Sequence, residues 1–172
     1  MEDRVKRAVE LFKSGYNCSQ SVVAAFADLY GFTEEQALKM ASSFGGGIGR
    51  MRETCGAACG IFLLAGLQTG TTDPKDKEGK AANYKLVQDL AAIFKNRMGS
   101  INCGELLGLK KCDPIESTPE ERTAQYYAKR PCKRWNSAYG CSCTSYDCGQ
   151  LTLEWCLSFY YGLSSIFADW QF

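Results

Sequence analysis

Cysteine is the side chain best suited to chemistry in this sequence, because the chain holds 10 cysteines and no histidine. Without histidine there is no Ser-His-Asp or Cys-His catalytic pair and no histidine metal ligand. In a reducing compartment, a dense set of thiols favours metal or cluster binding, or reversible redox chemistry, over structural disulfides. The competing interpretation is that many of these cysteines are small buried hydrophobic side chains.

Three cysteines directly follow a residue that commonly caps a helix N-terminus, so each is predicted at the first position of a helix. Amide groups and partial positive charge at a helix N-terminus favour thiolate over thiol. Thiolate is the form that binds metals, attacks disulfides and oxidises. The alternative is coincidence, since asparagine and threonine are ordinary caps. The three pairs are Asn17–Cys18, Thr54–Cys55 and Asn102–Cys103.

Two more cysteines are candidates for the same site. Cys132 precedes Lys133 and Arg134, and nearby cations lower the pKa of a cysteine. Cys59 lies one helical turn after Cys55, on the same predicted face, within a stretch of small residues. In that stretch Gly56 and Gly60 are four residues apart, which would let another backbone, with its own sulfur, approach closely. Simple tight packing is the alternative use of these small residues.

Apolar residues at helical spacing predict the elements that must position these cysteines. Capping signals mark two helix starts, Thr33 with Gln36, and Thr118 with Pro119 and Glu121. Four glycines in residues 45–50 indicate a loop that positions the helix of Cys55. That loop lacks the Gly-Lys-Ser/Thr and preceding strand of a phosphate cradle. Helices are predicted over about residues 5–13, 18–30, 33–44, 55–68 and 80–98, with a short helix from 102 and another from 118 toward 129.

The predicted fold is therefore all-α, a compact single-domain bundle of about six or seven helices with a glycine-rich loop. We place this domain at residues 1–134. Residues 135–172 are predicted to be an atypical tail of uncertain structure, rich in cysteine and aromatic residues, because all 20 basic residues lie before residue 136. A second metal site is the competing interpretation of the four cysteines in this tail, Cys141, Cys143, Cys148 and Cys156.

Charge and hydropathy argue against several other classes of function. A net charge of +1 gives no large field to attract nucleic acid or anionic lipid. No window reaches the roughly 20 apolar residues that cross a bilayer. The first residues lack the apolar core of a secretory signal. We therefore expect a cytoplasmic protein with no nucleic acid partner and no membrane span.

Five ordered motifs make the sequence resemble the C_GCAxxG_C_C family of redox-active proteins. They are YNCSQS at 16–21, FGGGIGR at 44–50, ETCGAACG at 53–60, NCGELLG at 102–108 and PC at 131–132. The resemblance implies a helical redox domain whose four signature cysteines are Cys18, Cys55, Cys103 and Cys132. Cys59 and Cys112 lie outside that signature, as do the cysteines of the tail.

The leading hypothesis is a redox or electron-transfer protein in which the four signature cysteines converge. They would hold an iron–sulfur cluster, or cycle between thiols and a disulfide. Zinc bound by the four cysteines is a less favoured cofactor, because zinc modules usually pair ligands within a few residues. A helical interaction module with incidental thiols is the third hypothesis. An unidentified redox protein and a second copy of the chain are the partner hypotheses.

Overall fold

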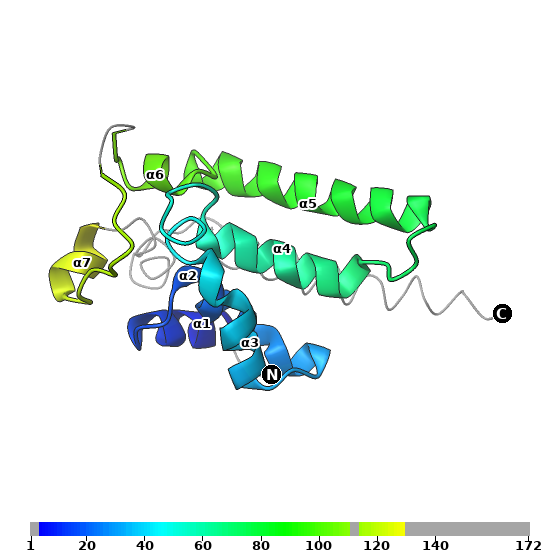
Figure 1. The fold of residues 1–172 in the computed structure, drawn as a ribbon, viewed down its shortest axis with the longest axis horizontal. Coiled ribbons are helices and arrows are strands. Elements are labelled where there is room, and N and C mark those ends of the chain that lie inside the picture. Colours follow the sequence, from blue (N-terminus) through cyan, green and yellow to red (C-terminus); the bar gives the residue numbers. More distant parts are fainter. Residues whose placement is uncertain (1–3, 111–113, 130–172) are drawn as a thin grey trace, which may run out of the picture.

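The computed structural model describes residues 4–110 and 114–129, and over these residues the chain is helical and forms no sheet (Figure 1). The prediction of an all-α bundle with about six or seven helices is confirmed for this part of the chain. Short 3₁₀ turns, Ala27–Tyr30 and Ser42–Phe44, follow two of the helices. The helices are α1 (Arg4–Lys13), α2 (Cys18–Phe26), α3 (Glu34–Ala41), α4 (Gly56–Thr69), α5 (Lys77–Met98), α6 (Cys103–Leu106) and α7 (Ala124–Lys129).

Helix α2 is the centre of the bundle, because it packs against α1, α3 and α4. Seven of its nine residues are buried, which its run of small and apolar side chains permits. Helix α5 lies alongside α4 as the second arm of a hairpin (Figure 1). The main core joins Val22 and Phe26 of α2 to Ile61 of α4 and Phe94 of α5. Burying each such side chain contributes roughly 1.5–3 kcal/mol to folding.

Local capping explains where several helices begin and end. Asn17 and Gln20 form a reciprocal capping box at the start of α2, with both hydrogen bonds 3.0 Å long. Thr33 and Gln36 form a second box at α3, as predicted. Gly99 ends α5 in the left-handed conformation that glycine adopts without strain. These starts depend on residues close in sequence, so they are predictable from sequence alone.

The predicted N-cap of α4 is wrong by one residue. Helix α4 begins at Gly56, and its N-cap is Cys55 rather than Thr54. Thr54 instead forms an isolated antiparallel β-bridge with Asn102. Because that bridge occupies the backbone around Thr54, the helix starts one residue later.

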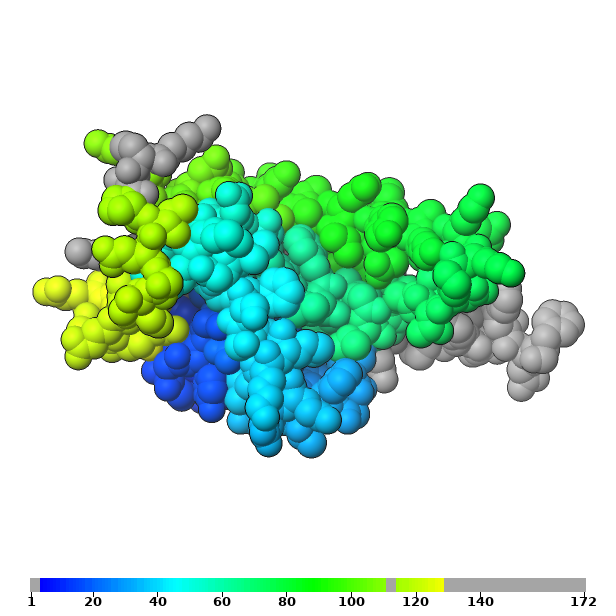
Figure 2. Space-filling view, in the orientation of Figure 1, coloured from blue at the N-terminus to red at the C-terminus, as the bar shows by residue number. Residues whose placement is uncertain are grey.

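The helix predicted from Thr118 is also wrong at its start, since α7 begins at Ala124. The residues before it, 114–123, form no helix and lie beside the N-terminal helices and the glycine-rich turn (Figure 2). Two hydrogen bonds hold this segment: Arg50 Nε donates to the Glu116 carbonyl at 2.8 Å, and Arg122 Nη2 donates to the Tyr16 carbonyl at 3.2 Å. These long-range contacts override the local capping signal.

The glycine-rich loop is a tight left-handed turn. Gly46, Gly47 and Gly49 have positive φ, as do three residues that are not glycine, Ile48, Arg50 and Arg52 (φ 58°, 65° and 64°). A left-handed conformation costs roughly 1–2 kcal/mol for each such residue, so the rest of the fold must stabilise this turn.

None of the helices in the described ranges has the length and hydrophobicity required to span a membrane. This agrees with the expectation from the hydropathy pattern. The predicted tail at 135–172 lies outside the described residues, and so does Cys112.

Candidate functional site

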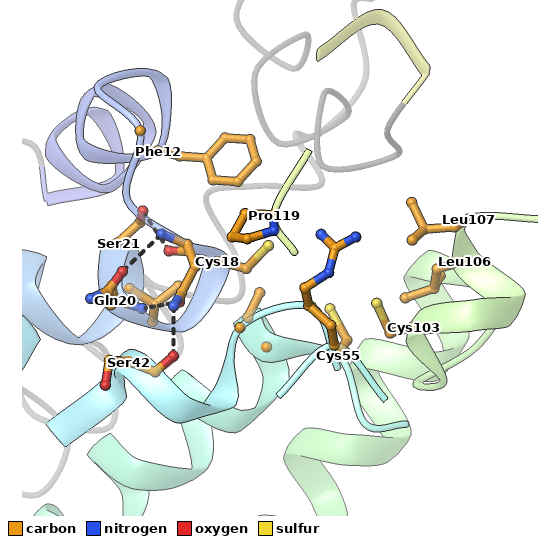
Figure 3. A pocket seen from close by; sticks show the side chains of 18 of the residues that line it. Phe12, Cys18, Gln20, Ser21, Ser42, Cys55, Cys103, Leu106, Leu107 and Pro119 are labelled. Carbon is orange, nitrogen blue, oxygen red and sulfur yellow. Dashed lines mark hydrogen bonds between the residues drawn. The ribbon is translucent and has the colours of Figure 1, made fainter. Parts of the chain in front are cut away.

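A cavity of about 530 Å³ lies beside the N-terminal ends of α2, α4 and α6. Three of the four signature cysteines line it: Cys18, Cys55 and Cys103. Figure 3 shows their side chains on one side of the cavity, with the sulfur atoms directed toward its interior. Cys55 and Cys103 are buried, with 7% and 8% of their surface exposed, and Cys18 is half-buried. The fold therefore gathers three cysteines that are far apart in the sequence.

Helices α2 and α4 approach each other closely because α4 carries glycine where they meet. A Cβ atom on Gly56 would lie 2.7 Å from the Phe44 carbonyl oxygen and 3.4 Å from Cys18 Cβ. On Gly60 it would lie 2.9 Å from Val22 Cβ. The prediction that these two glycines admit another backbone, with its own cysteine, is confirmed.

A pair of backbone hydrogen bonds joins the start of α4 to the start of α6. The Cys55 amide donates to the Ile101 carbonyl at 2.8 Å, and the Cys103 amide donates to the Glu53 carbonyl at 2.6 Å. These bonds flank the bridge between Thr54 and Asn102. Because side chains alternate between the two faces of a strand pair, residues on either side of the bridge share a face. Cys55 and Cys103 are thus held on the same face.

The left-handed turn is seated directly against Cys103. A Cβ atom on Gly47 would lie 2.5 Å from Cys103 Cβ and 2.8 Å from the Glu53 amide nitrogen. Gly45 similarly makes room for the side chain of Asn17, the cap of the Cys18 helix. The turn therefore contacts groups at the starts of both α2 and α6, beyond the predicted role of positioning α4.

Three arginines also line the cavity, and they are not among the site residues predicted from the sequence. Arg50, Arg52 and Arg122 stand with a single carboxylate, Glu120, so the charged residues described in the lining carry a net charge of +2. Glu120 lies 3.6 Å from Arg50 Nη2 and 3.5 Å from Arg52 Nη2. The available signal was the pair of arginines between the glycines and the second signature cysteine.

Cys59 occupies a different environment. It is buried, its Sγ donates to the Thr54 carbonyl at 3.7 Å, and it is absent from the described lining of the cavity. Burial raises the pKa of the Cys59 thiol, and negative charge on Cys103 raises it further. The raised pKa disfavours the thiolate form of Cys59.

The described residues contain no group of three Cys, Asp or Glu side chains that could hold a metal ion. Cys132, the fourth candidate, lies outside the described residues.

The fold and the cavity define a small helical protein with a cysteine-lined, electropositive cavity. The chain belongs to the family described as "Putative redox-active protein (C_GCAxxG_C_C)", whose model matches residues 16–155. This match confirms the family identified from the five motifs. The match also extends past residue 134, into the predicted tail at 135–172. Comparison with curated proteins and with solved structures gave no match.

Proposed function

We propose that this protein performs reversible thiol–disulfide exchange with the cysteines of the cavity, Cys18, Cys55 and Cys103, together with Cys132. The observation that carries the proposal is that three cysteines from separate helix starts line one cavity. A disulfide needs only two sulfur atoms at a time, whereas a cysteine-bound cluster or zinc ion takes four ligands. Thiol–disulfide exchange therefore requires fewer cysteines close together than a cluster or a zinc ion does.

The reaction would run in two steps. A cysteine thiolate attacks one sulfur of a substrate disulfide, the substrate S–S bond breaks, and half of the substrate leaves as a thiolate. A second cysteine, deprotonated, then attacks the protein sulfur of the mixed disulfide and releases the other half. Two electrons pass to the substrate, and the two protons lost by the cysteines are taken up by the released thiolates.

The surroundings of the three cysteines support this chemistry. Cys18 begins a nine-residue helix, whose N-terminal amides favour negative charge. The guanidinium groups of Arg50, Arg52 and Arg122 line the same cavity and also favour an anionic sulfur. Cys59 lacks these features, so we assign it no role in exchange.

An iron–sulfur cluster held by Cys18, Cys55, Cys103 and Cys132 is the principal alternative, and zinc on the same four ligands is less favoured. A helical interaction module with incidental thiols is the third. The cytoplasmic location, the redox partner protein and self-association stay predictions.

The proposal predicts that mild oxidation joins two of Cys18, Cys55, Cys103 and Cys132, and that a reductant reverses it. We would purify the full chain without oxygen, measure bound iron, sulfide and zinc, and oxidise it with a stepwise series of disulfide buffers. Differential alkylation with mass spectrometry would identify the paired cysteines. Recovery of all thiols after reduction is the expected result.

Cys59→Ala is the matched control, because it removes a neighbouring cysteine that the described cavity does not contain. It should leave the disulfide pairing unchanged, whereas Cys18→Ala, Cys55→Ala or Cys103→Ala should each remove or redirect it. Stoichiometric iron with sulfide would establish the cluster alternative instead, and stoichiometric zinc the metal alternative. If the protein contains no metal and its cysteines do not change oxidation state across the buffer series, the helical interaction module would be the alternative that remains.

A further inference from the structure

Two arginines that line the cavity each have a buried guanidinium nitrogen. Nη1 of Arg52 and Nη1 of Arg122 are buried and have no hydrogen-bond partner among the described residues. Both side chains line the cysteine cavity. A buried charged donor without an acceptor is costly, so these atoms point to an acceptor that the described part of the chain does not supply.

The other contacts of these arginines hold them in place without satisfying them. Arg122 donates through Nη2 to the Tyr16 carbonyl, and its guanidinium lies over the rings of Phe12 and Tyr126, at 5.2 and 4.8 Å from the centroids. Arg52 has its backbone fixed in the left-handed turn and one long ion pair to Glu120. Preorganised guanidinium groups of this kind bind carboxylates and other oxyanions well.

The remainder of the cavity is largely apolar. Val9 and Phe12 of α1, and Leu106 and Leu107 at the end of α6, line it together with the three cysteines. Its volume of about 530 Å³ suits a small organic molecule. One cavity therefore offers an apolar surface, anchored cations and sulfur.

We infer that this cavity selects substrates that carry a carboxylate beside an apolar portion, with the carboxylate held by Arg52 and Arg122. That such a molecule is a disulfide substrate rests on the proposed function; that its carboxylate binds here does not. The substrate would then be a small anionic organic disulfide, reacting by the two-step exchange given above. The competing explanation is that the arginines only hold residues 116–122 against the rest of the protein.

A pair of disulfide reagents tests the selectivity. The bis-nitrobenzoate disulfide DTNB carries carboxylates, whereas 2,2′-dithiodipyridine is neutral, and both report thiol attack by absorbance. Mass spectrometry assigns the fast phase to the cavity cysteines. The ratio of the two rate constants isolates recognition of the carboxylate, because any change in thiolate reactivity affects both reagents.

Arg52→Gln is expected to lower this ratio about tenfold or more, as loss of a charged hydrogen bond implies. Arg52→Lys should restore part of it. Arg7→Gln is the matched control, since Arg7 pairs with Glu34 at 2.9 Å and is absent from the described lining. An unchanged ratio in Arg52→Gln and in Arg122→Gln, with circular dichroism showing intact helices, would overturn the inference.

Binding of an unreactive anion separates this inference from the proposed function. By calorimetry, 4-nitrobenzoate should bind the wild-type chain more tightly than neutral 4-nitrobenzyl alcohol, and Arg52→Gln should remove the difference. If neither disulfide reacts with a cavity cysteine, exchange is refuted while this measurement still decides the anion site. If nitrobenzoate shows no preference over the alcohol, the anion site is refuted whatever the thiols do.

Discussion

The two ends of α4 use the same residue type for different purposes. At the N-terminal end there is no room for a side chain, because a Cβ atom on Gly56 would lie 2.7 Å from the Phe44 carbonyl oxygen and one on Gly60 would lie 2.9 Å from Val22 Cβ of α2. Toward the C-terminal end, a Cβ atom on Gly66 would meet nothing within 4 Å. Glycine is required where the cysteines are brought together and is replaceable a turn or two further along. The close packing of α4 against its neighbours at these glycines is therefore found at the end of α4 that borders the cavity.

The left-handed turn repeats this contrast over a shorter distance. Gly47 and Gly49 both have positive φ, 75° and 57°. Only Gly47 is packed against Cys103, since a Cβ atom on Gly49 would have nothing within 4 Å. Both glycines adopt a left-handed backbone, but only at Gly47 would an added side chain clash with Cys103.

The largest expected effect comes from Gly47→Ala. The new Cβ would strain the left-handed backbone and clash with Cys103 Cβ and the Glu53 amide, for a combined loss of about 3 kcal/mol or more in unfolding free energy. Gly49→Ala adds only the backbone strain, and should lose about 1 kcal/mol. Urea unfolding followed by circular dichroism measures both. Equal losses in the two variants would show that contact with Cys103 does not constrain the turn.

The next prediction is that alanine substitution changes the unfolding free energy in opposite directions at the two ends of α4. Gly60→Ala places a Cβ 2.9 Å from Val22 Cβ and 3.2 Å from the Ser19 carbonyl oxygen, so it should lower the unfolding free energy by about 1–3 kcal/mol. Gly66→Ala should raise it by about 0.5–1 kcal/mol, because alanine loses less entropy than glycine in a helix.

The same urea titrations measure this pair. Gly60→Ala should also slow disulfide formation at Cys18, because it pushes α2 away from the start of α4, whereas Gly66→Ala should not. If Gly60→Ala is as stable as the wild type, the close approach of α2 and α4 is not what positions Cys18.

The parts of this fold that sequence predicts are those whose causes are local. Asn17 with Gln20 and Thr33 with Gln36 mark helix starts through bonds spanning three residues. The shift of the α4 cap arises from a bridge between Thr54 and Asn102, far apart in the sequence. Nothing near Thr118 indicates that the following residues will line the cavity instead of forming a helix.

The residues of the candidate site likewise divide into those that can be predicted from the sequence and those that cannot. Cys18, Cys55 and Cys103 were predictable from the family motifs, and Cys18 and Cys103 also from the cap residue before each. The cap predicted before Cys55 is wrong, because Cys55 is itself the N-cap of α4. Arg52 and Arg122 were not predictable, because their role depends on a left-handed backbone and on packing over Phe12 and Tyr126. Arginine is common on surfaces, so only the fold distinguishes these two from the rest.

The smallest predicted effect lies at the ion pair of Arg4 and Asp28, which the described cavity does not include. Arg4 donates two hydrogen bonds to the Asp28 carboxylate, at 2.6 and 2.8 Å. The Asp28 side chain is 56% exposed, so Asp28→Asn should lower the unfolding free energy at pH 7 by only about 0.5 kcal/mol. The Arg4 bond to the Ala25 carbonyl remains in the variant.

The direction of the pKa shift of Asp28 determines how the contribution of this ion pair to stability changes with pH. The hydrogen bond from Arg4 holds the pKa of Asp28 below its usual value of 3.8, so the native state binds this proton less readily than the unfolded state. The stabilisation is therefore complete above pH 3.8 and is lost as the pH falls through the lowered value. The difference between wild type and Asp28→Asn should shrink over that acidic range in urea titrations, and thiol reactivity at pH 7 should be the same in both. A difference that persists when Asp28 is protonated would mean that the substituted amide side chain disturbs the packing of α1 on α2, and that charge is not the cause.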